Sequence, residues 1–79
     1  MYFTYILRSD KDGSCYTGIT DNLKRRIAEH NSGNVTYTSS KSPFRLVWFC
    51  GFPTKKKALE FELYLKSHSG IAFRNKRLI

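Results

Sequence analysis

The chain is long enough for one small hydrophobic core. It has 79 residues, and a domain of this size buries a smaller share of its surface than a larger domain does. Aromatic residues make up 15 % of the sequence, and each buried ring removes a large apolar area from water. We therefore expect one folded domain over residues 1–79, without internal repeats or disordered segments.

Two strands joined by a tight loop are predicted at the start of the chain. Tyr2 to Leu7 is rich in aromatic and β-branched residues, and Cys15 to Ile19 resumes that pattern. The polar segment between them contains Asp-Gly, which is typical of a hairpin turn. We expect antiparallel pairing, which could bring Tyr5 and Tyr16 onto one face of the sheet.

Two helices are predicted further along. Side-chain oxygens at positions 20–22 can cap a helix that begins near Leu23 and ends in the polar run 31–34. Thr54 can cap a second helix over Lys55 to Lys66. The apolar run Phe44 to Phe52 reads as a buried central strand after a loop over residues 35–43.

The last residues, 71–79, form a short basic tail, for which a further helical turn that packs Ile71, Phe73 and Leu78 is one possibility. The order of elements is then strand, strand, helix, strand, helix and a short C-terminal helix. This order favours an α+β fold, with a small three-stranded antiparallel sheet flanked by helices.

The charge of the chain points to a polyanionic partner. Fourteen Lys and Arg face six Asp and Glu, for a net charge of +8, and such an excess reports on partners rather than on fold. A membrane span needs about 18 consecutive apolar residues, and no such run exists. We therefore expect nucleic acid as the partner and no membrane, with a solubilising surface as the alternative explanation.

The two cysteines indicate a reducing compartment. Cys15 and Cys50 lack the spacing of a zinc site, and we expect free thiols. The first residues carry no charged segment ahead of the apolar run, so a signal peptide is not expected. The predicted location is the cytoplasm, or the nucleus in a eukaryote.

Several side chains could carry chemistry. A tyrosine such as Tyr5 or Tyr16 usually packs in a core, but its hydroxyl can position water or phosphate. Arg26 and His30 are four residues apart and share a helix face. That face is either exposed to solvent or a phosphate-binding site in which the guanidinium donates hydrogen bonds to phosphate oxygens.

Glu62 is the acidic residue that most needs an explanation. It shares a helix face with Ala58, Leu59 and Leu65, whereas Glu60 points elsewhere and should be exposed. A carboxylate on an apolar face is costly unless it is paired or bound to metal. Either a salt bridge to Arg26 or Lys66 or a role as a Mg²⁺ ligand meets this need, and the spacing does not choose between them.

The chain resembles the GIY-YIG nuclease family. Phe3-Thr4-Tyr5 and Tyr16-Thr17-Gly18 are similar to the two tripeptides that name the family, although Phe3-Thr4 replaces Gly-Ile and Thr17 replaces Ile. Residues 22–31 resemble the family helix that carries an Arg and a His, here Arg26 and His30. Tyr37-Thr38 ahead of Pro43 also fits the family pattern, and residues 58–67 resemble the second helix, whose Glu falls on Glu62.

The resemblance covers almost the whole chain and is greatest to small single-domain members of the excinuclease C-like and UPF0213-like kind. It implies a metal-dependent endonuclease that hydrolyses phosphodiester bonds in DNA, including branched or damaged DNA. It implies one Mg²⁺, or Mn²⁺, held by Glu62. The catalytic residues that it implies are Tyr5, Tyr16, Arg26, His30 and Glu62.

The roles implied by the resemblance agree with simple chemistry. Arg26 would neutralise the charge that builds on the phosphate. Tyr5 would help to activate the attacking water, and Tyr16 would orient water or phosphate. His30 would either take a proton from Tyr5 or serve as the base itself, and both options stay open.

Backbone contacts to nucleic acid are expected from Gly18, where the chain can approach a phosphate closely, and from Lys24, Arg25, Lys41, Arg45, Lys66 and Arg74. The alternative is a non-catalytic nucleic-acid-binding module that acts with a protein partner. A third reading is a protein-binding domain, indicated by any apolar patch left uncovered on the Phe44 to Phe52 strand. The sequence does not decide whether the substrate is DNA or RNA or what shape it has. The oligomeric state and the biological pathway also stay open.

Overall fold

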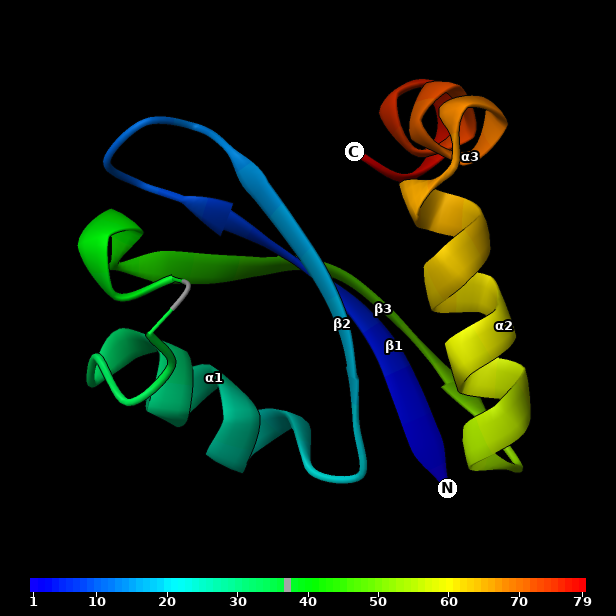
Figure 1. The fold of residues 1–79 in the computed structure, drawn as a ribbon, viewed down its shortest axis with the longest axis horizontal. Coiled ribbons are helices and arrows are strands. Elements are labelled where there is room, and N and C mark those ends of the chain that lie inside the picture. Colours follow the sequence, from blue (N-terminus) through cyan, green and yellow to red (C-terminus); the bar gives the residue numbers. More distant parts are fainter. Residues whose placement is uncertain (37) are drawn as a thin grey trace.

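The predicted α+β fold is confirmed. The computed structural model describes residues 1–36 and 38–79, so Tyr37 of the family pattern lies outside the described residues. Three antiparallel strands, β1 (Tyr2–Ser9), β2 (Cys15–Thr20) and β3 (Phe44–Phe52), form one sheet in the order β2-β1-β3. Figure 1 shows this sheet between a helix on one side and a helix on the other.

The turn between β1 and β2 forms as its Asp-Gly pair predicts. Gly13 has a φ of +76°, which a residue with a side chain rarely adopts. The backbone N–H of Ser9 donates to the Ser14 carbonyl at 2.8 Å. Asp12 accepts from the Ser14 hydroxyl at 2.7 Å and from its N–H at 2.9 Å, and these bonds hold the pKa of Asp12 well below its usual range.

β3 is an edge strand, and the expectation of a buried central strand was wrong. The centre belongs to β1, whose residues 4–7 are all buried, whereas Phe49 of β3 is 51 % exposed. The apolar side chains of β3 serve a different purpose, because Trp48 and Phe52 pack their rings against Phe61 with centroid distances of 5.7 and 5.6 Å. An apolar run does not distinguish a central strand from an edge strand that lies under a helix.

The two main helices begin at the predicted caps. α1 (Leu23–Asn31) follows Asn22, whose side chain accepts from the Arg25 N–H at 3.0 Å. α2 (Lys55–Lys66) follows Thr54, whose hydroxyl accepts from the Lys57 N–H at 3.2 Å. Each bond satisfies one of the backbone donors that a helix leaves unpaired at its start.

The helices cover opposite faces of the sheet. The Thr4 hydroxyl donates to the Ala58 carbonyl of α2 at 2.8 Å, while the Tyr5 hydroxyl lies 3.0 Å from His30 of α1. Consecutive residues of a strand point to opposite faces, so the sheet is the middle layer of three, as Figure 1 shows. A buried cluster of Tyr5, Leu7 and Phe44 fills the space under α1.

A side-chain clamp fixes the end of α1 to the start of β3. Asn31 donates to the Phe44 carbonyl at 3.2 Å and accepts from the Phe44 N–H at 2.6 Å. The segment between them was expected to be a loop, and its described part contains one short 3-10 turn, η1 (Ser39–Lys41). The clamp sets the position of α1 along the sheet.

The C-terminal segment is more helical than its sequence suggested. α3 (His68–Phe73) begins directly after α2, with Ser67 as its cap, and leads into a π-helical turn, η2 (Arg74–Leu78). Its apolar side chains do not form a buried turn: Ile71 is 40 % exposed and Phe73 is 37 % exposed. The Phe73 ring packs on Tyr64 of α2, with 6.0 Å between centroids.

Gly70 makes the sharp bend between α2 and α3 possible. A Cβ at this position would overlap the Tyr64 carbonyl oxygen, which is backbone and cannot move aside. We expect Gly70→Ala to lower the free energy of unfolding by about 1–3 kcal/mol, as overpacking does. Urea denaturation would measure the loss beside Ser69→Ala, a control at an exposed neighbour. Equal midpoints for the two variants would contradict the proposed tight contact.

Candidate active site

The hairpin brings the two tyrosines together on the α1 face. Tyr5 pairs with Gly18 and Leu7 pairs with Tyr16, and residues opposite each other in an antiparallel pair share a face. The rings of Tyr5 and Tyr16 have centroids 6.2 Å apart. The predicted juxtaposition is therefore confirmed.

Gly18 makes room for this pair of rings. A Cβ there would lie 2.7 Å from the Tyr5 hydroxyl oxygen and 3.0 Å from Cε1 of Tyr16. The sequence suggested that a glycine here would let the backbone approach a phosphate, which stays a prediction. The structure gives the glycine a separate purpose, because any larger residue would displace the Tyr5 hydroxyl.

His30 is enclosed between Tyr5 and Thr38. Its side chain is fully buried, with Nε2 3.0 Å from the Tyr5 hydroxyl and Nδ1 2.7 Å from the Thr38 hydroxyl. The Thr38 hydroxyl in turn donates to the backbone carbonyl of Val35 at 3.4 Å. We therefore assign the proton to Nδ1, so that Nδ1 donates to Thr38 and Nε2 accepts from Tyr5.

The electrostatics of the pair follow from burial. Burial, and then the positive charge of Arg26, lower the pKa of His30 below its ordinary value, so the ring is neutral near pH 7. Burial also raises the pKa of Tyr5 to about 12. Tyr5 thus keeps its proton in the resting protein, and its hydroxyl donates a hydrogen bond to the neutral imidazole of His30.

Burial of a neutral His30 predicts that the fold weakens in acid. The unfolded chain binds a proton at this residue near pH 6.5, whereas the folded chain binds it only at lower pH. Stability contributed by the neutral ring is therefore present above about pH 6.5 and is lost as pH falls below it, by up to about 1.4 kcal/mol per pH unit.

Urea denaturation at about pH 7.5 and about pH 5 would measure this loss. His30→Gln should be less stable overall but should lose less on acidification than the unmutated protein. His68→Gln is the matched control, since His68 is exposed. Equal acid sensitivity in His30→Gln and the unmutated protein would contradict the assignment of a buried neutral ring.

Arg26 lies one helical turn before His30, and both side chains lie beside Tyr5. Its Nη1 donates to Glu29 at 3.0 Å, and it lies beside the Tyr5 side chain. Glu29, then Tyr5, raise the pKa of Arg26 well above its ordinary value, so the guanidinium stays charged. One third of its side chain remains exposed, at 33 %, which leaves it accessible to a phosphate.

Glu62 lies on α2, and its charge acts on Tyr5. Its side chain is 13 % exposed, and Oε2 accepts from Lys66 Nζ at 2.7 Å. Of the two salt bridges that the sequence allowed, the one to Lys66 forms, whereas Arg26 pairs with Glu29. The charge of Glu62 contributes to the raised pKa of Tyr5, so the carboxylate acts on the cluster electrostatically. Glu60 is exposed, as predicted.

The donor set near Glu62 suits a hard cation only if substrate and water complete it. Among residues 1–36 and 38–79, no group of three His, Cys, Asp or Glu side chains could hold a metal. Mg²⁺ is usually bound by one or two carboxylates together with phosphate oxygens and waters. One carboxylate with low exposure fits that pattern, provided that Lys66 moves aside or turns to the phosphate.

The predicted backbone contacts fall into separate groups. Lys24 and Arg25 are exposed on α1, and Arg25 pairs with Asp21 at 2.9 Å. Lys41 and Arg45 instead form ion pairs with carboxylates of the β1–β2 loop. Lys41 pairs with Asp12 at 3.3 Å, and Arg45 pairs with Asp10 at 2.7 Å. Lys66 and Arg74 line a common pocket next to Tyr16.

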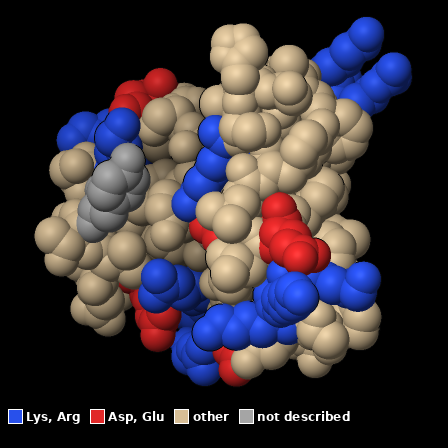
Figure 2. Space-filling view, turned by 45° about the vertical axis from the view of Figure 1, so that its right-hand side comes forward, with Lys and Arg blue, Asp and Glu red and all other residues tan. Residues whose placement is uncertain are grey.

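Basic side chains also gather where no contact was predicted. Figure 2 shows Lys and Arg gathered toward the lower part of the face that it presents. The first turn of α2, at the lower right of Figure 1, lies at this level of the molecule. Lys55, Lys56 and Lys57 occupy that turn and are all exposed. The run of three lysines was visible in the sequence as a possible signal.

Other predictions concern the environment of the chain. Cys15 and Cys50 are free thiols, as expected, and location in the cytoplasm stays a prediction. None of the helices formed by the described residues is both long and apolar enough to cross a membrane.

Known proteins resemble the chain over most of its length. The family model for the GIY-YIG catalytic domain matches residues 1–76. The UPF0213 protein BH0048 of Halalkalibacterium halodurans is 46% identical over 66 residues, which cover 82% of this chain and 69% of that protein. The UPF0213 protein CPE1444 of Clostridium perfringens is 45% identical over 67 residues, covering 84% and 71%.

A solved structure agrees with the fold. The solution NMR structure of the UPF0213 protein BH0048 from Bacillus halodurans matches with a TM-score of 0.58 and 37% sequence identity, over 99% of this chain and 87% of that one. The family match spans both tyrosines, Arg26, His30 and Glu62. The chain therefore belongs to the GIY-YIG catalytic domain family, which is a family of nucleases.

Proposed function

We propose that this protein is a metal-dependent endonuclease that hydrolyses phosphodiester bonds in DNA, including branched or damaged DNA. One observation carries the proposal: the Tyr5 hydroxyl bonds to a buried neutral His30 at 3.0 Å, beside a charged and partly exposed Arg26. These residues come from a strand and a helix that the fold brings together, and membership of a nuclease family supports a chemical role.

The hydrogen bond between Tyr5 and His30 suggests a path for the proton of the attacking water. Tyr5, with its pKa raised to about 12, cannot first lose its proton to solvent near neutral pH. It can take a proton from water as it passes its own to Nε2 of His30, so that His30 is the final acceptor. The water oxygen then forms the new bond to phosphorus, and the leaving ester oxygen departs as an alcohol after protonation from solvent.

The remaining groups would manage charge. Arg26 would pair with phosphate oxygens and stabilise the charge that develops on them. Glu62 would hold Mg²⁺ or Mn²⁺, which supplies polarisation of the phosphoryl group and stabilisation of the leaving oxygen. Tyr16, whose ring lies 4.8 Å from that of His30 between centroids, would orient water or phosphate.

A non-catalytic nucleic-acid-binding module is the second candidate. It is favoured by the internal partners of both charged groups, since Arg26 pairs with Glu29 at 3.0 Å and Glu62 pairs with Lys66 at 2.7 Å. These pairs neutralise the groups without metal or substrate. Such a module would bind DNA or RNA and cut neither.

A protein partner for targeting also remains a proposal. It is supported by the β3 surface, where Leu46, Val47, Trp48 and Phe49 line a shallow hollow. Phe49 is 51 % exposed there. Exposed apolar surface of this kind is often used for binding another protein.

The test uses labelled linear, nicked, flapped, four-way-junction and single-stranded DNAs, with RNA counterparts, in Mg²⁺, Mn²⁺ or EDTA. We expect cuts that need metal and that are lost in Arg26→Ala. Arg77→Ala is the matched control, because Arg77 is exposed and lies outside the candidate site. Binding without cuts in either metal would overturn the enzyme and favour the binding module.

A further inference from the structure

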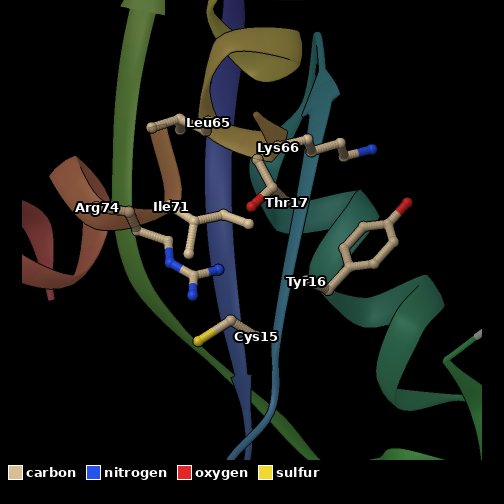
Figure 3. A pocket seen from close by; sticks show the side chains of 7 residues that line it. All are labelled: Cys15, Tyr16, Thr17, Leu65, Lys66, Ile71 and Arg74. Carbon is tan, nitrogen blue, oxygen red and sulfur yellow. The ribbon is translucent and has the colours of Figure 1, made fainter. Parts of the chain in front are cut away.

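A pocket opens at the edge strand β2, beside Tyr16 and mostly on the α2 face of the sheet. It has a volume of about 500 Å³ and lies between β2 and the bend from α2 to α3. Figure 3 shows its lining side chains, which besides Tyr16 are Cys15, Thr17, Leu65, Lys66, Ile71 and Arg74. Tyr16 and Lys66 extend toward the same side in that view. Because Lys66 also pairs with Glu62, the pocket adjoins the candidate active site.

The lining combines an apolar surface with cations. Ile71 and Thr17 face each other across the middle, and the Arg74 guanidinium points toward the Cys15 thiol (Figure 3). No acidic side chain lines the pocket among the described residues. Arg74 has no ion pair with any described carboxylate, and its Nε donates to the neutral amide of Asn75 at 3.0 Å.

A second guanidinium, that of Arg8, lies on the same face of the sheet as Cys15. Arg8 stands opposite Cys15 in the β1–β2 register, and opposite residues share a face. Its Nε is buried and has no hydrogen-bond partner among the described residues. The end of the pocket near Cys15 therefore carries positive charge that no described acidic group neutralises by an ion pair.

We propose that this pocket holds one unpaired nucleotide of the strand that is cut, next to the scissile phosphate. The base packs on Ile71, Arg74 contacts the phosphate on the Cys15 side, and Lys66 contacts the phosphate on the Tyr16 side (Figure 3). This inference rests on the proposed nuclease function and names its substrate class. A pocket with an apolar wall and a few placed charges is typical of sites for molecules of this size.

The requirement for an unpaired base follows from the shape of the pocket. A base in a duplex is stacked on both sides and must leave the stack to enter a pocket. Extrusion from a perfect duplex has an energetic cost, and this cost is least where the base is already unpaired. Single strands, flaps and junctions should therefore be cut faster than intact duplex.

The test is a scan with single abasic nucleotides placed around the mapped cut position in the best-cut oligonucleotide. A base that stacks on an aromatic side chain gains on the order of tenfold or more in affinity, and a base packed on the smaller Ile71 side chain should gain about the lower end of that range. We therefore expect one abasic position to lower kcat/KM by about tenfold, while the other positions change it little.

Variants connect that position with the pocket. In Ile71→Ala, cutting of the intact oligonucleotide should slow, and the abasic penalty should fall from about tenfold to about twofold. Arg74→Ala should raise KM and weaken the dependence on salt. Ile79→Ala and Arg77→Ala are matched controls, because both residues are exposed and neither lines the pocket.

Each outcome decides between the proposals. Cutting with no sensitive abasic position, or with the same penalty in Ile71→Ala as in the unmutated protein, would overturn the pocket and leave the nuclease intact. No cutting of any oligonucleotide in Mg²⁺ or Mn²⁺ would overturn both. A single sensitive position whose penalty falls to about twofold in Ile71→Ala would establish the pocket.

Discussion

Replacing Glu62 with Gln should stop DNA cutting and leave DNA binding close to that of the unmutated protein. The substitution keeps the shape of the side chain and removes the charge that would hold the metal. A metal at a phosphoryl group supplies several kcal/mol of transition-state stabilisation, so the expected loss is on the order of 10²- to 10³-fold in rate. Single-turnover cleavage with an excess of protein would measure it.

The control for this prediction lies on the same helix. Glu60→Gln makes the same chemical change at an exposed position on a different face of α2. Both variants raise the net charge by one, so a simple gain in attraction to DNA would affect both equally. Cutting by Glu62→Gln at the rate of Glu60→Gln would show that Glu62 holds no catalytic metal.

Binding separates the catalytic role of Glu62 from a structural one. Its partner Lys66 is freed in Glu62→Gln, because the 2.7 Å ion pair loses its negative member. Affinity for DNA should then stay the same or rise slightly in fluorescence anisotropy. A loss of both binding and thermal stability would mean that the ion pair holds α2 in place instead.

The local parts of the fold were predictable because short-range chemistry determines them. The turn at Gly13 depends on two adjacent residues, and the caps Asn22 and Thr54 each bond to an N–H three residues later. Such signals need no knowledge of distant parts of the chain. They fixed the hairpin and the start of both main helices.

Features that depend on distant packing could not be predicted. The position of β3 at the edge follows from which strand pairs with both neighbours, and the run of apolar residues says nothing about that. The bend before α3 depends on contact between Gly70 and the Tyr64 carbonyl. A glycine near the end of a helix does not by itself predict this bend, because glycines commonly occur where helices end.

In the candidate site, too, some features were predictable from the sequence and others depend on distant packing. Resemblance supplied the residue types, and the register of the hairpin explains why Tyr5 and Tyr16 meet. Resemblance gave neither the bond from His30 to Thr38 nor the pairing of Arg26 with Glu29. Thr38 lies eight residues beyond His30, outside the reach of helical spacing.

The choice between Tyr5 and His30 as the base can be reduced to a double-mutant test. His30 is fully buried, and its two ring nitrogens are taken by Tyr5 and Thr38. Since Tyr5 is the hydrogen-bond partner of Nε2, the water's proton would reach His30 through the Tyr5 hydroxyl. If the two act as one relay, Tyr5→Phe and His30→Gln should each lower kcat by on the order of 10²-fold or more.

The double variant decides whether there is a relay, because residues that act as one unit are strongly non-additive. Tyr5→Phe combined with His30→Gln should cut about as slowly as the slower single variant, whereas independent roles would multiply the two losses. The unmutated protein should lose activity as pH falls through the lowered pKa of His30, since only the neutral ring can accept a proton. Tyr5→Phe should lose that acid limb along with its rate. An unchanged acid limb in Tyr5→Phe, with multiplied losses in the double variant, would show instead that His30 works without the tyrosine.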